Sequence, residues 1–152
     1  MGTHYEGTKK EEQTLNAFIK LMRATESINN RLNRQLAEQD LTVSQFGVLE
    51  ALLHLGPLNQ KALGEKLLKS GGNITLVIDN LEKSGWVERQ RDPEDRRSML
   101  IHLTEAGEKL IRSYFPEHLK HIMKEFEPLT SKELEKLAEM CKKIGRKEED
   151  NK

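Results

Sequence analysis

The apolar residues near the start of the chain recur three and four positions apart, which is the spacing of one face of an α-helix. This pattern predicts a single long helix over about residues 12–38. Its apolar stripe consists of Leu15, Phe18, Ile19, Met22, Ile28, Leu32 and Leu36. The polar residues 1–11 are expected to form a flexible N-terminus.

Two shorter helices follow the long one. Thr42 with Gln45 three positions later is typical of a capping box, which predicts that a helix begins there. Gly56-Pro57 is placed to end this helix. A third, short helix is predicted over about residues 59–69.

The turn Ser70-Gly71-Gly72 then interrupts the helical pattern. Ser70 is placed to cap the next helix, and glycine tolerates backbone angles that other residues rarely adopt. The buried stripe of that helix is predicted to hold Ile74, Val77, Ile78 and Leu81. Outside the stripe lie Asn73, Leu76, Asn80 and Lys83. Gly85 is placed to end the helix.

From Trp86 the pattern changes to an alternation of period two, which indicates β-strands. Strands are predicted over residues 86–91 and 98–103. Between them, Asp92-Pro93-Glu94-Asp95 has the order that a type I turn prefers. The prediction is a β-hairpin with a charged tip.

Two more helices are predicted within residues 105–145. Thr104 can cap the first, which is expected to bend near Pro116. Thr130 and Glu133 form a second capping box, which opens the last helix. Residues 146–152 are expected to be a charged tail.

Two short helices joined by a glycine-containing turn and followed by a β-hairpin define a winged helix-turn-helix. The predicted fold class is therefore mainly α with a small β-hairpin wing. The winged helix-turn-helix is predicted over residues 42–104, within a single domain of residues 12–145. Helices over residues 12–38 and 105–145 flank it.

The helix that starts near Asn73 can enter the major groove of duplex DNA, where base edges present distinct donors and acceptors. Asn73 can bond adenine bidentately, and Thr75 can bond a base or contact a thymine methyl group. Ser70 and the helix N-terminal amides can hold a phosphate. Leu76 and Asn80 complete the candidate contacts of this helix.

The hairpin supplies the remaining candidate DNA-binding residues. Arg89, Arg91, Arg96 and Arg97 fall within nine residues. Such arginines suit a wing that follows the DNA backbone and enters a narrow minor groove, with Arg97 the first candidate and Arg96 the second. Asp95 either orients one arginine through an ion pair or serves as a turn residue.

Composition neither requires nor excludes nucleic acid, because 25 basic residues balance 25 acidic ones. The single cysteine, Cys141, excludes an internal disulfide and suits a reducing compartment. The N-terminus lacks an apolar signal segment, and no apolar run is long enough to span a membrane. A cytoplasmic protein without a membrane partner is expected.

Several stretches of the sequence resemble the MarR family of transcriptional regulators. They are Asn73-Ile74-Thr75, residues 79–89, Asp92-Pro93-Glu94-Asp95-Arg96-Arg97-Ser98 and Leu103-Thr104-Glu105-Ala106-Gly107. The resemblance covers almost the whole chain. The stretch from Ser70 to Thr75 is similar to that of Gram-positive members that respond to catechols and quinones.

This resemblance implies a homodimer in which the first and last helices of two subunits intertwine and hold two winged domains over a palindromic operator. It implies a repressor that releases DNA when a small phenolic or other aromatic effector, or an oxidant, arrives. The effector pocket it implies is lined by Phe18, Met22, His54 and Phe115. Many relatives have arginine where this chain has Leu76 and Asn80, so more of the affinity is expected to come from the wing.

Other interpretations of the same residues stay open. The winged fold also occurs in protein-interaction modules. Cys141 could sense oxidants, although its place on an apolar stripe favours an inert, buried thiol. His118, His121 and Glu125 could bind a metal, as in zinc-responsive relatives, although a solvated face is the simpler account and no metal site is expected.

An enzyme is not expected. The sequence has no HExxH, CxxC, GxSxG or glycine-rich phosphate loop. Its five histidines are scattered, without a recognisable acid, base and nucleophile. No cofactor is expected either.

Overall fold

A computed structural model describes residues 2–67 and 71–145 of the chain. The chain divides into two compact units, residues 1–116 and 117–152. Ser70 and the predicted tail over residues 146–152 lie outside the described residues. The mainly helical fold with a small antiparallel sheet confirms the predicted fold class.

The first helix, α1 (Lys9–Leu36), begins three residues earlier than predicted because Thr8 forms a capping box with Glu11. The Thr8 hydroxyl accepts a hydrogen bond from the backbone N–H of Glu11, whose carboxylate accepts one from the N–H of Thr8. A 3-10 turn, η1 (Ala37–Gln39), follows α1. It ends at Asp40, whose φ of 57° reverses the chain.

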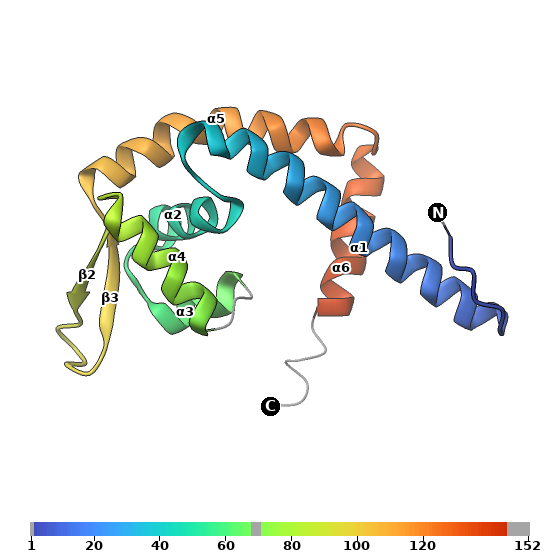
Figure 1. The fold of residues 1–152 in the computed structure, drawn as a ribbon, viewed down its shortest axis with the longest axis horizontal. Coiled ribbons are helices and arrows are strands. Elements are labelled where there is room, and N and C mark those ends of the chain that lie inside the picture. The colour runs from blue at the N-terminus through green and yellow to red at the C-terminus, as the bar shows by residue number, and fades with distance from the viewer. Residues whose placement is uncertain (1, 68–70, 146–152) are drawn as a thin grey trace. The chain divides into compact units, whose positions relative to one another are not determined.

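Three helices and a sheet form the winged helix-turn-helix of residues 1–116 (Figure 1). The capping box of Thr42 and Gln45 opens α2 (Val43–Leu55), as predicted. Next come α3 (Gln60–Leu67) and α4 (Gly71–Lys83). Gly85 has a φ of +78° and follows the end of α4, in agreement with its predicted role.

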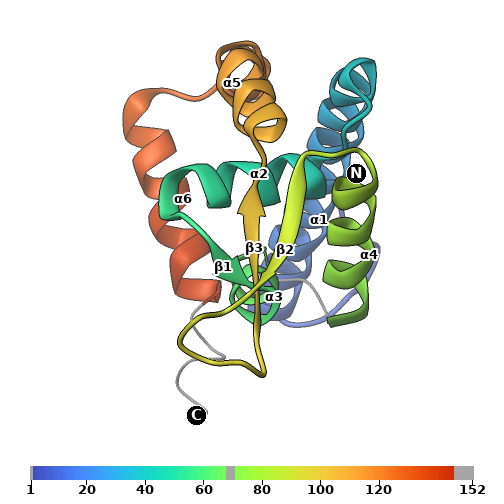
Figure 2. The same ribbon diagram turned by 90° about the vertical axis from the view of Figure 1, so that its left-hand side faces the viewer.

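The sheet contains one more strand than the sequence predicted. Strands β2 (Val87–Arg91) and β3 (Met99–Leu103) form the predicted hairpin, and β1 (Leu58–Asn59) pairs with the other edge of β3. Figure 2 shows the resulting order β1-β3-β2. A two-residue strand is too short for an alternating pattern, so it left no signal in the sequence.

One hydrophobic core holds these elements together. Its buried side chains come from the end of α1, from the segment between η1 and α2, from α2, α3 and α4, from both hairpin strands and from the helix that follows them. They are Leu36, Leu41, Phe46, Val48, Leu49, Leu52, Leu63, Ile74, Ile78, Leu81, Val87, Ile101 and Ile111. The predicted buried stripe of α4 is therefore confirmed, with Val77 half-buried beside it.

Helix α5 (Glu105–Phe126) begins at Thr104, whose hydroxyl accepts from the N–H of Gly107 and donates to the carbonyl of Gly85. The helix continues through Pro116. The capping box of Thr130 and Glu133 opens α6 (Ser131–Gly145), as predicted. Within the described residues, no helix is long and apolar enough to cross a membrane.

Candidate nucleic-acid interface

Helices α3 and α4 are joined by polar contacts as well as by the core. The Asn59 side chain accepts a hydrogen bond from the N–H of Ala62 at 2.8 Å and so caps the start of α3. At the next residue, the side-chain amide of Gln60 donates a hydrogen bond to the hydroxyl of Thr75 at 2.5 Å. Thr75 is half-buried, and this bond ties the first turn of α3 to the first turns of α4.

The outward face of α4 is polar except at its centre. Asn73, Asn80 and Lys83 are exposed there, as the sequence predicted. Leu76 lies between the two asparagines, and 61% of its surface is exposed. This face therefore offers two amides, which can each donate and accept a hydrogen bond, and an ammonium group at its C-terminal end.

Arg89 is held by α4 rather than presented at the hairpin tip. Its guanidinium donates to Asp79 at 2.6 Å and to Glu82 at 3.0 Å, and its backbone N–H also donates to Glu82. Only 21% of the Arg89 side chain is exposed. The structure therefore gives Arg89 a supporting position between β2 and α4.

The exposed side chains of Arg91 and Asp95 make hydrogen bonds to the backbone of the hairpin loop. The guanidinium of Arg91 donates to the carbonyl of Arg96 at 2.7 Å. The Asp95 carboxylate accepts from the N–H of Arg97 at 3.0 Å, which makes Asp95 a turn residue, one of its two predicted roles. The N–H of Ser98 bonds the Asp95 carbonyl, so this reversal lies three residues later than the predicted turn.

Arg96 and Arg97 are exposed in the loop between β2 and β3, and Arg91 at the end of β2 is exposed as well. The exposed face of α4 and the two tip arginines belong to the same unit of the chain. Together they can bond the edges and the phosphates of a polyanion. We name this set, Asn73, Leu76, Asn80, Lys83, Arg96 and Arg97, the outward surface.

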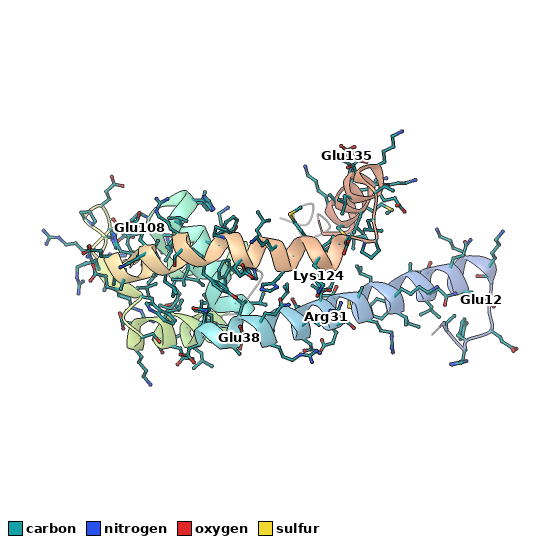
Figure 3. All side chains as sticks on the ribbon, turned by 90° about the horizontal axis from the view of Figure 1, so that it is seen from above. Glu12, Arg31, Glu38, Glu108, Lys124 and Glu135 are labelled. Atoms are coloured by element: carbon teal, nitrogen blue, oxygen red, sulfur yellow. The ribbon has the colours of Figure 1, made fainter. Side chains whose placement is uncertain are left out.

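The predicted effector residues fall into two separate groups. The ring of Phe115 meets His54 edge-on at 6.3 Å and stacks on Phe46 at 6.4 Å. Phe18 and Met22 instead lie exposed on the N-terminal half of α1, which extends away from α2 (Figures 1 and 3). Figure 3 labels Glu12 near the far end of this half. The single chain therefore does not assemble all four residues into one pocket.

The cysteine prediction is corrected. Cys141 is exposed on α6 among the described residues, whereas its place on an apolar stripe favoured burial. The neighbouring Met140 and Ile144 are exposed as well. Burial within the single chain therefore gives no reason to regard this thiol as inert.

The histidines of α5 are arranged as an ordinary helix face. His121 lies 3.5 Å from the carboxylate of Glu117, one turn away. His118 is buried, and this burial, with a smaller contribution from His121, lowers its pKa. Among the described residues, no three histidine, cysteine or acidic side chains gather closely enough to hold a metal.

Sequence reasoning missed three supporting residues: Gln60, Asp79 and Glu82. A signal for the acidic pair was available. Strand alternation places Arg89 on the same face as the buried Val87, and Asp79 and Glu82 are three positions apart on α4. Nothing in the pattern around Gln60 pointed to Thr75, because their contact depends on how the two helices cross.

A helix-turn-helix followed by a wing, with a polar outward helix face and arginines at the wing tip, defines the class of winged helix-turn-helix transcriptional regulators. Residues 41–99 match the model of the MarR family. The HTH-type transcriptional regulator MhqR of Bacillus subtilis (strain 168) is 37% identical over 134 residues, which are 88% of this chain and 92% of that protein. The chain belongs to the MarR family of transcriptional regulators.

Solved structures agree with this assignment. Sco3205, a MarR family regulator from Streptomyces coelicolor solved in complex with DNA, has a TM-score of 0.84 at 23% identity, covering 95% of this chain and 92% of its own. A mutant of MarR from E. coli complexed with operator DNA has a TM-score of 0.79 at 25% identity, and the match covers 87% of this chain and 95% of that one. The resemblance predicted from the sequence is therefore confirmed.

Proposed function

We propose that this protein binds duplex DNA sequence-specifically through the outward surface. Helix α4 lies in the major groove, where Asn73 and Asn80 bond base edges. Arg96 and Arg97 reach the backbone and the adjacent minor groove. The observation that carries the proposal is that Arg96 and Arg97 are exposed in the loop of the hairpin, whereas the guanidinium of Arg89 is held by α4 and that of Arg91 donates to the Arg96 carbonyl.

The proposed functional form is a homodimer, with residues 42–104 binding DNA and the helices over residues 12–38 and 105–145 forming the subunit contact. Apolar side chains exposed on these helices in the single chain support it. They are Phe18, Met22, Leu119, Met123, Leu134, Met140 and Ile144. Two-fold symmetry then places two copies of α4 about 34 Å apart, which is one turn of DNA, and makes the operator a palindrome.

The proposed action is repression relieved by a small aromatic effector of the phenol or quinone type. The exposed ring of His54 and the half-buried ring of Phe115, which meet edge-on, give such a ligand flat surfaces to pack on. A structure of similar fold, BpsR of Bordetella bronchiseptica, is described as having its DNA binding regulated by 6-hydroxynicotinic acid, a hydroxylated aromatic ring. Binding would favour a dimer geometry in which the two recognition helices no longer fit successive grooves.

The proposal is tested by selecting duplexes from a random pool on the purified full-length protein. A palindrome with half-sites about one turn apart is the expected result. The enriched duplex then serves to screen phenols, quinones and oxidants for release of DNA. If no sequence is enriched, and binding is weak even at low salt, DNA recognition by the ligand-free protein is wrong, and the winged fold serves protein contacts instead.

A further inference from the structure

Leu76 is an anomaly on the outward face of α4. Three other apolar residues of this helix, Ile74, Ile78 and Leu81, are at most 2% exposed, whereas Leu76 is 61% exposed. It lies three positions after Asn73 and four before Asn80, so the three side chains share one face of the helix. A ligand that contacts the amides of Asn73 and Asn80 will therefore also contact the exposed side chain of Leu76.

The chemistry of this face restricts what Leu76 can recognise. A leucine side chain offers no hydrogen bond and no charge, so it cannot read the donors and acceptors of a base edge. The apolar group that base edges present in the major groove is the C5-methyl of thymine. Contact between this methyl and an exposed leucine removes apolar surface of both from water, which favours binding.

The neighbouring Thr75 does not take this position on the face. Its hydroxyl accepts the hydrogen bond from Gln60, and the residue is half-buried against α3. Leu76 is therefore the exposed apolar side chain of the first two described turns of α4, and both of its flanking polar partners suit base edges.

We propose that Leu76 is a specificity-determining residue that reads the C5-methyl of a thymine in each half-site. This inference rests on the proposed function, because it requires α4 to lie in the major groove. It also says what the operator must contain. The base pair opposite Leu76 is recognised by the methyl group of its thymine, and the amides of Asn73 and Asn80 read the base pairs on either side.

The test replaces thymine by uracil, one position at a time, in the duplex enriched by the full-length protein. Uracil keeps every hydrogen-bonding group of thymine and lacks the methyl. At the position opposite Leu76, we expect the wild type to bind the uracil duplex about threefold to fivefold more weakly per half-site. Binding of Leu76→Ala to thymine and uracil duplexes should be equal at that position.

Two matched variants separate methyl reading from a general loss of binding. Leu76→Met keeps an apolar side chain of similar size, so it should keep most of the thymine preference. Asn80→Ala should bind more weakly yet keep the thymine-to-uracil ratio of the wild type. Because Leu76 is exposed, Leu76→Ala should unfold at the wild-type temperature, which thermal denaturation checks.

The outcomes distinguish the inference from the function on which it rests. If the wild type binds its operator tightly and no uracil substitution weakens it, or if Leu76→Ala keeps the same ratio, then methyl reading by Leu76 is wrong and sequence-specific binding stands. If the wild type prefers no sequence at all, the proposed function fails, and the inference fails with it.

Discussion

Arg89 of β2 and Asp79 of α4 form an ion pair between the wing and helix α4, with Nη2 and Oδ1 2.6 Å apart. Arg89 pairs with the buried Ile101 of β3 in the sheet register. It therefore lies on the inner side of the hairpin, where Glu82 also reaches it. The base of the wing is fixed to the helix that is proposed to read DNA.

Arg89→Ala should lower both stability and DNA affinity. We expect the free energy of unfolding to fall by about 1 kcal/mol, a value discounted because Asp79 and Glu82 are close to half exposed. DNA affinity should fall because the wing no longer has one position relative to α4. Denaturant titration and binding to the enriched duplex measure the two effects.

Arg96→Ala is the control for this prediction. Arg96 is exposed at the tip, so its loss should change the free energy of unfolding by less than about 0.5 kcal/mol. Equal stability of Arg89→Ala and the wild type would show that the ion pair does not hold the wing.

Arg97→Ala should weaken DNA binding at least several-fold without affecting folding. Arg97 is exposed, and its loss removes one cation from the phosphate region. The slope of the logarithm of the binding constant against the logarithm of salt concentration should therefore decrease by about 1. Titrations at several salt concentrations measure this slope. An unchanged affinity and slope would remove the wing tip from the DNA contact.

Gly107→Ala should destabilise the winged domain strongly. A Cβ at this position would lie 2.0 Å from the backbone oxygen of Trp86, which also accepts the N–H of Thr104. Since backbone atoms must move to relieve this overlap, we expect a loss of about 1–3 kcal/mol in denaturant titrations. Gly72→Ala is the control, because a Cβ at this helical position meets nothing within 4 Å. That control should be neutral or stabilising by up to about 1 kcal/mol.

If Gly107→Ala is as stable as Gly72→Ala, the close approach of Gly107 in α5 to the backbone of Trp86 is wrong. The close approach would also be contradicted if Gly107→Ala lost less stability than alanine substitutions at glycines with open space around them.

His118 should make the protein less stable in mild acid. Burial lowers its pKa in the folded chain below the ordinary histidine value of about 6.5, so the unfolded chain binds the proton more readily. The stability is fully present above the ordinary pKa and is lost as the pH falls through it toward the folded pKa. Denaturant titrations from pH 8 to pH 5 should therefore show a falling free energy of unfolding.

His118→Gln should flatten this dependence, whereas substitution of the exposed His4 should leave it as in the wild type. A His118→Gln variant with the same decline in acid would place its origin in other groups.

Local patterns predicted the helices well because their signals are local. The capping boxes of Thr42 and Thr130, the terminating Gly85 and the buried stripe of α4 each depend on a few consecutive residues. The start of α1 was placed too late, because Thr8 with Glu11 lies in a stretch without apolar residues and was assigned to a flexible terminus.

The candidate site was predicted less completely, since roles within it depend on contacts between elements. The sequence grouped four wing arginines, but the hairpin register turns Arg89 toward α4 and the folded tip engages Arg91. Cys141 lies on an apolar stripe yet is exposed in the single chain, because a stripe indicates burial only when another surface covers it. The spacing of apolar residues shows which side of a helix is apolar, but it does not show which surface packs against that side.

The central claim, that the outward surface reads a DNA sequence, is tested most directly by two dissociation constants measured side by side. One is for the enriched duplex and the other for a scrambled duplex of the same composition, both at about 0.15 M salt. The account predicts that the enriched duplex binds at least about 1,000-fold more tightly. Equal dissociation constants would contradict it, because phosphate contacts alone would then account for all of the binding.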